Sequence, residues 1–186
     1  MNKLPRDFKY RKNGIEVRLV NEKDAEFILS LRLDPSLNQY IHSTDNDIEK
    51  QRQWIREYKI RENAGLDYYF IYSMDDEPFG LDRAYRVNPE DNSYMWGSWI
   101  CKPGVTAAQI MLQYIASADI INNCVGLELN TYMVSKGNLK VLYYHRKTLR
   151  SNEIGESGDD ILFSNTKQMR EEASNRFKRI LRIENK

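Results

Sequence analysis

The chain has 186 residues, with 28 lysines and arginines against 27 aspartates and glutamates, so its charge is nearly balanced. This length suits one domain, residues 1–186, with a buried core and a ligand cleft. The charge balance lacks the basic excess that attracts nucleic acid or anionic membranes, so we expect small-molecule partners, no nucleic acid and no membrane. No stretch has the length and apolar character of a membrane-spanning helix, and the polar amino terminus does not resemble a signal peptide, which favours a cytoplasmic location. Two cysteines and two histidines are too few for a disulfide framework or a zinc site, so we expect no metal.

The hydrophobic pattern along the chain predicts a mixed α/β domain. Apolar and polar residues alternate over the first strand, whereas the segment after Thr106 carries apolar residues at helical spacing and forms the clearest helix. The strand, helix and strand between residues 93 and 134 can form a right-handed crossover. The expected strands are 14–20, 67–74, 79–87, 93–101, 125–134, 151–156 and 160–165, and the expected helices are 21–33, 46–63, 106–121, 138–149 and the charged segment 167–183.

A strand that runs through a short loop into a helix is the first candidate binding site. The segment from Tyr94 to Gln109 reads YMWGSWICKPGVTAAQ. Small residues at a helix start let a phosphate approach unpaired backbone N–H groups, and the helix dipole favours its negative charge. Lys102 adds a cation at the entrance. The segment therefore fits a pyrophosphate site, and it equally fits an ordinary helix start.

The second motif lies one strand later, where Val134-x-x-x-Asn138 leads into a helix. Val141 follows the asparagine by three residues, and the cluster His145-Arg-Lys begins seven residues after it. In their order and separation, this motif and the earlier loop resemble the GNAT superfamily of N-acetyltransferases. The architecture resembles that family over roughly residues 15–165, but the specific motifs occupy only about residues 94–109 and 131–149. The loop has Pro103 or Thr106 where the family has a basic residue or glycine, which leaves open a member that binds acyl-CoA without catalysis.

The resemblance implies a mixed central sheet of about six to seven strands, with helices on both faces and a splayed central strand pair. It implies acetyl-coenzyme A (acetyl-CoA) as cofactor and direct transfer of the acetyl group to an amine. A homodimer is compatible with the resemblance. Backbone groups of the strand that ends at Cys101 would bind the pantetheine arm as an added strand. The implied cofactor-binding residues are Trp99, Ile100, Cys101, Lys102, Gly104, Val105, Thr106, Ala107, Ala108, Gln109 and Asn138.

The resemblance also gives candidate catalytic residues. His145 stands where the family more often has a tyrosine that protonates the leaving thiolate, and a histidine with its ordinary pKa near 6.5 can donate a proton at neutral pH. Tyr144 is the alternative donor. Glu128 is the candidate base because it shares a predicted strand face with Asn130. Each of these side chains can instead serve packing or solvation alone.

The acceptor is expected to be an amino group of a nucleotide-linked sugar used for surface polysaccharides. The segment Asp34-Pro-Ser-Leu-Asn38, the central Trp54 and the pair Tyr144-His145 look like the GNAT branch that acetylates such sugars. The same branch point includes enzymes that acetylate ribosomal-protein amino termini. A protein amino-terminal acetyltransferase and a non-catalytic acyl-CoA-binding or interaction module are the alternatives. The candidate acceptor-binding residues are His42, Asp82, Arg83, Tyr85 and Trp96, with Arg86 as a further phosphate contact.

Overall fold

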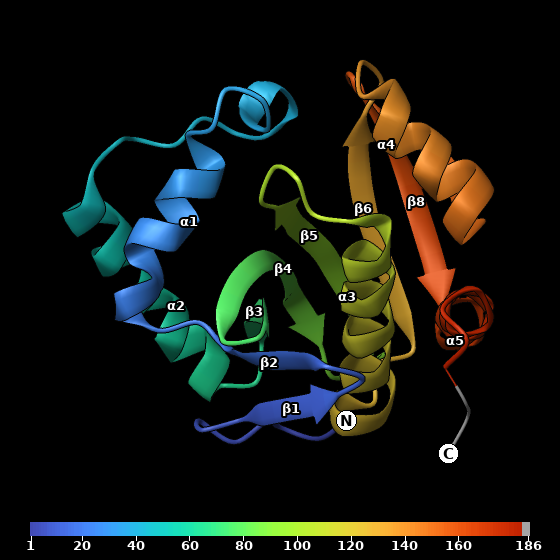
Figure 1. The fold of residues 1–186 in the computed structure, drawn as a ribbon, viewed down its shortest axis with the longest axis horizontal. Coiled ribbons are helices and arrows are strands. Elements are labelled where there is room, and N and C mark those ends of the chain that lie inside the picture. Colours follow the sequence, from blue (N-terminus) through green and yellow to red (C-terminus); the bar gives the residue numbers. More distant parts are fainter. Residues whose placement is uncertain (184–186) are drawn as a thin grey trace.

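The computed structural model describes residues 1–183, and its central feature is one eight-stranded sheet in the order β1-β2-β3-β4-β5-β6-β8-β7 (Figure 1). β5 and β6 are parallel neighbours joined through a helix, and the other neighbouring strands are antiparallel. The strands are β1 Lys9–Lys12, β2 Ile15–Leu19, β3 Asp67–Met74, β4 Glu77–Asn88, β5 Ser93–Cys101, β6 Leu129–Ser135, β7 Asn152–Ser157 and β8 Asp160–Thr166. The helices are α1 Ala25–Arg32, α2 Ile48–Asn63, α3 Ala107–Asp119, α4 Leu139–Tyr143 and α5 Lys167–Ile180. The mixed α/β fold is confirmed.

The sheet is larger than predicted because β1 was not recognised. Its sequence Lys-Tyr-Arg-Lys lacks apolar alternation, and only Tyr10 is partly buried. β1 pairs with β2 through Asn13 and Gly14, whose φ angles of 54° and 76° are both positive. Asn-Gly is the preferred pair for a tight hairpin with positive φ at both turn residues. The dipeptide was therefore the sequence signal for this edge strand.

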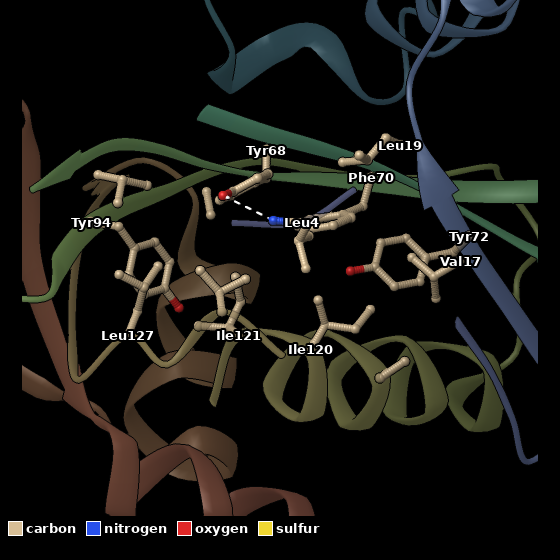
Figure 2. Packing of buried hydrophobic residues seen from close by; sticks show 14 of the residues in the cluster. Leu4, Val17, Leu19, Tyr68, Phe70, Tyr72, Tyr94, Ile120, Ile121 and Leu127 are labelled. Carbon is tan, nitrogen blue, oxygen red and sulfur yellow. Dashed lines mark hydrogen bonds between the residues drawn. The ribbon is translucent and has the colours of Figure 1, made fainter. Parts of the chain in front are cut away.

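Helices cover both faces of the sheet, as predicted. α1 and α2 pack on one face, where Ile28 and Ile55 meet Tyr69 and Leu81 of the strands. α3 and the turn that follows it cover the opposite face; Figure 2 shows Phe70 and other sheet residues above Ile120 and Ile121. α5 packs beside α3, with the rings of Phe177 and Tyr114 5.4 Å apart. No helix within residues 1–183 combines the length and apolar character required to cross a membrane.

β6 begins later than predicted because the preceding helix is longer. α3 continues as a π-helical segment over Ile120–Val125, and the chain leaves it at Gly126, which has a φ of 82°. A glycine with positive φ is a common end of a helix because it lacks a Cβ. Residues 125–128 therefore belong to the end of the helix and its connection, and the strand starts at Leu129.

The central strand pair is splayed. Ser93–Met95 of β5 pair with Leu129–Thr131 of β6, and no pairing follows beyond these residues. In β5, Ile100 pairs with Leu81 and Gly97 pairs with Arg83, so Ser98 and Trp99 form a β-bulge opposite a single residue of β4. Ser98 has a φ of 51°. Because a bulge bends its strand, it directs β5 away from β6 (Figure 1).

Asp82 is the residue opposite this bulge, and its side chain is only 1% exposed. It accepts hydrogen bonds from the Tyr72 hydroxyl at 2.8 Å, the Trp96 indole N–H at 2.9 Å and the Ser117 hydroxyl at 2.8 Å. Burial raises the pKa of Asp82, while the three donors act in the opposite direction. The prediction that Asp82 contacts substrate is therefore wrong, because its carboxylate joins β3, β4, β5 and α3 inside the core.

Replacing this carboxylate should destabilise the fold. Asp82→Ala leaves two buried hydroxyl donors and the part-buried Trp96 indole N–H without their acceptor, and we expect the free energy of unfolding to fall by about 3 kcal/mol or more. Urea denaturation measures the change. Asp45→Ala, which removes an exposed carboxylate paired with Lys50, is the control and should change stability by less than about 0.5 kcal/mol. A loss below about 1 kcal/mol for Asp82→Ala would contradict this account.

Candidate functional site

The splay leaves backbone edges of β5 and β6 without a strand partner in the described chain. This stretch of β5 includes the predicted residues Trp99, Ile100 and Cys101. Ile100 is buried on the α1–α2 side, and the Cys101 thiol donates a hydrogen bond to Gln113 Oε1 at 2.9 Å. Burial raises the pKa of Cys101 to about 12, so this thiol stays protonated at neutral pH. These side chains anchor β5, and its backbone edge can accept an extended ligand as an added strand.

The loop between β5 and α3 presents backbone N–H groups at the start of the helix. Thr106 and Gln109 form a reciprocal cap, in which Gln109 Oε1 accepts from the Thr106 N–H at 2.9 Å and Thr106 Oγ1 accepts from the Gln109 N–H at 3.2 Å. The N–H groups of Gly104, Ala107 and Ala108 have no such partner within residues 1–183. All three residues are exposed. This arrangement fits an anionic group, with Thr106 and Gln109 shaping the loop.

The other two predicted loop residues face away from this helix start. Val105 is half-buried against the core beneath α3. The Lys102 ammonium lies 5.5 Å from the centre of the Phe27 ring in α1, so its charge is directed toward α1. The backbone of the loop, more than its lysine, therefore provides the positive end for a phosphate.

Aromatic side chains fill the base of the splay. Trp99 of β5 stacks on Tyr144 with ring centres 5.2 Å apart, and Trp96 stacks on Trp99 at 5.6 Å. Trp96 also meets the edge of Tyr132 in β6 at 5.3 Å. Tyr144 and His145 begin a π-helical segment, Tyr144–Leu149, that continues α4. The two strands and this helix thus bring the predicted Trp96, Trp99, Tyr144 and His145 together.

The Tyr144 hydroxyl is the polar group of this cluster that lacks a hydrogen-bond partner within the described residues, and it is buried. Burial raises the pKa of Tyr144, so the phenol remains protonated at neutral pH. Buried polar atoms without partners are uncommon in folded proteins, and one in the aromatic cluster between the splayed strands fits a site that a ligand completes.

His145 differs sharply from its neighbour. Its side chain is 2% exposed, and its Nδ1 lies 2.9 Å from the Tyr132 hydroxyl. Tyr132 also bonds Ser151 Oγ at 2.6 Å and accepts from Asn165 Nδ2 at 3.3 Å. Burial lowers the pKa of His145 to about 3. The buried imidazole is therefore neutral at physiological pH, and it lacks the ordinary pKa on which its expected role as proton donor was based.

The proposed base Glu128 is misplaced as well. It precedes β6, its backbone N–H bonds Asn92 O at 2.8 Å, and its carboxylate is 56% exposed and 3.9 Å from the Lys167 ammonium. This position lies beside the paired ends of β5 and β6, opposite to the splay. Because the chain enters β6 only at Leu129, Glu128 does not share a strand face with Asn130, which is buried.

A cleft of about 830 Å³ opens beside the splay, between the α1–α2 connection and the strands β4, β5 and β6. Its lining includes the predicted His42, Arg83, Tyr85 and Trp96. Sequence reasoning missed Asp160, whose carboxylate at the start of β8 also lines the cleft and offers a proton acceptor there. The volume is within the usual range for small-molecule sites.

Two loops meet over this cleft. A Cβ added to Gly137 would lie 2.9 Å from a carbon of the exposed Tyr40 ring, so the turn before α4 closely approaches the α1–α2 connection. The next residue, Asn138, caps α4 by accepting the Val141 N–H at 3.3 Å. Its oxygen is thus engaged, and its amide NH₂ is the group with which it can bind a ligand.

Comparison with known proteins identifies the family. No family sequence model and no curated protein sequence matches the chain. The solved structure of apo FdhC, described as a nucleotide-linked sugar GNAT, is 36% identical with a TM-score of 0.81, covering 94% of this chain and 99% of FdhC. The chain belongs to the GNAT family of N-acetyltransferases.

More distant GNAT structures share the fold. The ribosomal-protein-S5-alanine acetyltransferase from Vibrio fischeri is 14% identical with a TM-score of 0.73, covering 87% of this chain and 97% of that enzyme. The spermidine N-acetyltransferase from Vibrio cholerae, solved with CoA and spermine, is 14% identical with a TM-score of 0.70, covering 86% and 99%. This GNAT therefore has the fold of enzymes with several acceptor classes.

The neutral state of His145 makes the stability of this GNAT depend on pH. Its folded pKa of about 3 lies below the ordinary value of about 6.5, so the unfolded chain binds more protons between these values and stability falls as pH falls. Between pH 7.5 and 4.5 we expect His145 to cost the fold about 3 kcal/mol. His145→Gln should remove this part of the pH dependence in urea denaturation.

The exposed histidine provides the matched control. His42→Gln, which replaces a histidine that is exposed in the fold, controls for the loss of one imidazole and should retain the pH dependence of the wild type. Equal losses of stability in the wild type and in His145→Gln between pH 7.5 and 4.5 would show that His145 takes up a proton in the folded protein.

Proposed function

We propose that this GNAT transfers the acetyl group of acetyl-CoA to a primary amine on a nucleotide-linked sugar. The observation that carries the proposal is the unpaired Tyr144 hydroxyl at the splay of β5 and β6. Its ring stacks on Trp99, which stacks on Trp96, and Trp96 lines a ligand-sized cleft. The similarity to FdhC, a nucleotide-linked sugar GNAT, supports the acceptor class. The arginine and aromatic side chains that line the cleft, among them Arg83 and Tyr85, suit a phosphorylated sugar.

Acetyl-CoA supplies an acetyl group activated as a thioester. The free backbone edge of β5 from Trp99 to Cys101 would bind its pantetheine arm, and the N–H groups of Gly104, Ala107 and Ala108 would bind its pyrophosphate. The Asn138 amide, whose oxygen caps α4, would donate to the same arm. The cofactor would provide hydrogen-bond partners for the buried Tyr144 hydroxyl and for the free amides of the loop, which have none within the described residues.

Tyr144 is the residue that we assign to proton donation. Its phenol keeps its proton at neutral pH because burial raises its pKa, and it has no competing partner within residues 1–183. It can therefore pass a proton to the departing thiolate, whose negative charge develops as the acceptor amine attacks. The neutral His145, held by Tyr132, instead packs against both Trp96 and Trp99 and supports their position.

The function is tested by a mass-spectrometric screen of amino-sugar nucleotides and amino-terminal peptides for an acetyl-sized gain with acetyl-CoA. We expect transfer to an amino-sugar nucleotide. Ala108→Glu places bulk and negative charge among the free amides, so acetyl-CoA binding should weaken at least tenfold, about 1.4 kcal/mol, in calorimetry. Asn175→Glu on the exposed face of α5 is the control and should bind normally. Transfer only to peptides would overturn the acceptor assignment.

The donor assignment predicts a clean separation of rate from stability. Tyr144→Phe removes a buried hydroxyl without a partner, so the free energy of unfolding should not fall. Loss of the proton donor should lower kcat about 100-fold or more, with the Kd for acetyl-CoA within about twofold.

Tyr143→Phe tests the neighbouring phenol, which is 66% exposed, and should leave both quantities unchanged. A loss of kcat below about fivefold for Tyr144→Phe would contradict the donor assignment and indicate that Tyr144 serves only in packing.

A further inference from the structure

A second hollow of about 670 Å³ adjoins the acceptor cleft where α2 ends and β3 begins. Three arginines, Arg61, Arg83 and Arg86, line it together with one carboxylate, Asp67. A lining with an excess of two positive charges attracts an anion, and arginine forks match the geometry of phosphate oxygens.

Asp67 orients two of these arginines without neutralising the hollow. It is 1% exposed, and its Oδ1 accepts from Arg83 Nε at 2.7 Å while its Oδ2 accepts from Arg61 Nε at 3.0 Å. Arg83 is further held over the rings of Trp54 and Tyr85, 4.9 Å from each centre. Holding the guanidinium groups in advance reduces the entropy lost when a ligand binds them.

Arg86 is the arginine without an acidic partner. Its backbone has a φ of 51° at an irregularity in the pairing of β4 with β5, which leaves the residue exposed. Its guanidinium has one contact within residues 1–183, with the Met95 sulfur at 3.6 Å, and no carboxylate lies within ion-pair distance there. This guanidinium is therefore available to a ligand at little desolvation cost.

The hollow and the acceptor cleft form one elongated surface. Arg83, Tyr85 and Arg86 line both spaces. The Tyr85 ring lies against Gly97 of β5, where an added Cβ would be 3.0 Å from ring carbon Cε1, so the shared wall leads directly to the splay. A ligand bound in both spaces would place one end near Trp96 and the other among the arginines.

We propose that this hollow is a binding site for the nucleoside diphosphate portion of the acceptor, with Arg86 and Arg83 binding its phosphates. The amino sugar then extends past Tyr85 into the larger cleft, with its amine toward the splay. The proposal rests on the proposed function, and it adds which end of the acceptor binds where and which arginines select a nucleotide-linked sugar over a free one.

The test is calorimetric titration of the intact protein with UDP and with dTDP, in saturating acetyl-CoA. The saturation matters because the cofactor also contains a nucleoside diphosphate, whose own site must be filled. We expect at least one of the two probes to bind, and Arg86→Ala to weaken that binding at least tenfold while the affinity for acetyl-CoA stays unchanged. Arg11→Ala, which removes another exposed arginine, in the edge strand β1, should bind the probe as the wild type does.

Two outcomes would overturn the proposal: neither probe binds, or the probe that binds does so equally well to wild type and Arg86→Ala. If inorganic pyrophosphate displaces the probe at the same concentration as the probe, the hollow binds the diphosphate alone, and the assignment of a nucleoside site is wrong. These results are distinct from failure of the acetyl transfer. Transfer to a free amino sugar with no effect of Arg86→Ala would contradict the nucleotide site and still support the transferase activity. Nucleotide binding that is sensitive to Arg86→Ala, without any transfer, would support the nucleotide site and contradict the transferase activity.

Discussion

The separation of β5 from β6 depends on the β-bulge at Ser98 and Trp99, and the site depends on that separation. The backbone pairing of these strands ends after Met95 and Thr131, although β5 continues to Cys101. A β-bulge leaves its extra residue unpaired and bends the strand that contains it. Here the buried Asp82 lies opposite the extra residue and accepts three hydrogen bonds, one of them from Trp96 in β5 itself. The core thus retains a buried carboxylate, and the bend it accompanies exposes the backbone edge proposed to bind the cofactor.

Burial and hydrogen bonding give two adjacent residues at the splay opposite chemical characters. Tyr144 and His145 are neighbours in one helical turn, and both rings lie close to Trp99. His145 has its Nδ1 engaged by Tyr132, and desolvation keeps the ring neutral. Tyr144 retains a protonated hydroxyl that nothing else in the described chain uses. The proposed assignment of proton donation to Tyr144 rests on this difference, because its hydroxyl is protonated at neutral pH and has no hydrogen-bond partner within the described residues.

The proposed ligand surface has two anion-binding parts, and each uses a different kind of hydrogen-bond donor. At the start of α3 the positive end comes from backbone N–H groups of Gly104, Ala107 and Ala108, which require small side chains around them. At the end of β4 it comes from arginine side chains, of which Arg83 is fixed by the buried Asp67. Backbone amides suit a phosphate that always occupies the same place, whereas guanidinium groups can discriminate among acceptors through planar hydrogen bonding.

Local periodicity and motif spacing were sufficient for the α/β class and for the order of most elements. These features depend on residues close together in the chain, where propensity and pattern act directly. The edge strand β1 was missed because only its Asn13-Gly14 turn, and no apolar alternation, indicated it. The burial of Asp82 and His145 and the exposed position of Glu128 were not indicated by the sequence, since each depends on parts of the chain far away in sequence. Asp82 is bound by Ser117 of α3, and His145 is bound by Tyr132 of β6. Desolvation and long-range hydrogen bonds arise only when the chain is folded, and they decided which side chains remain free to act on a ligand.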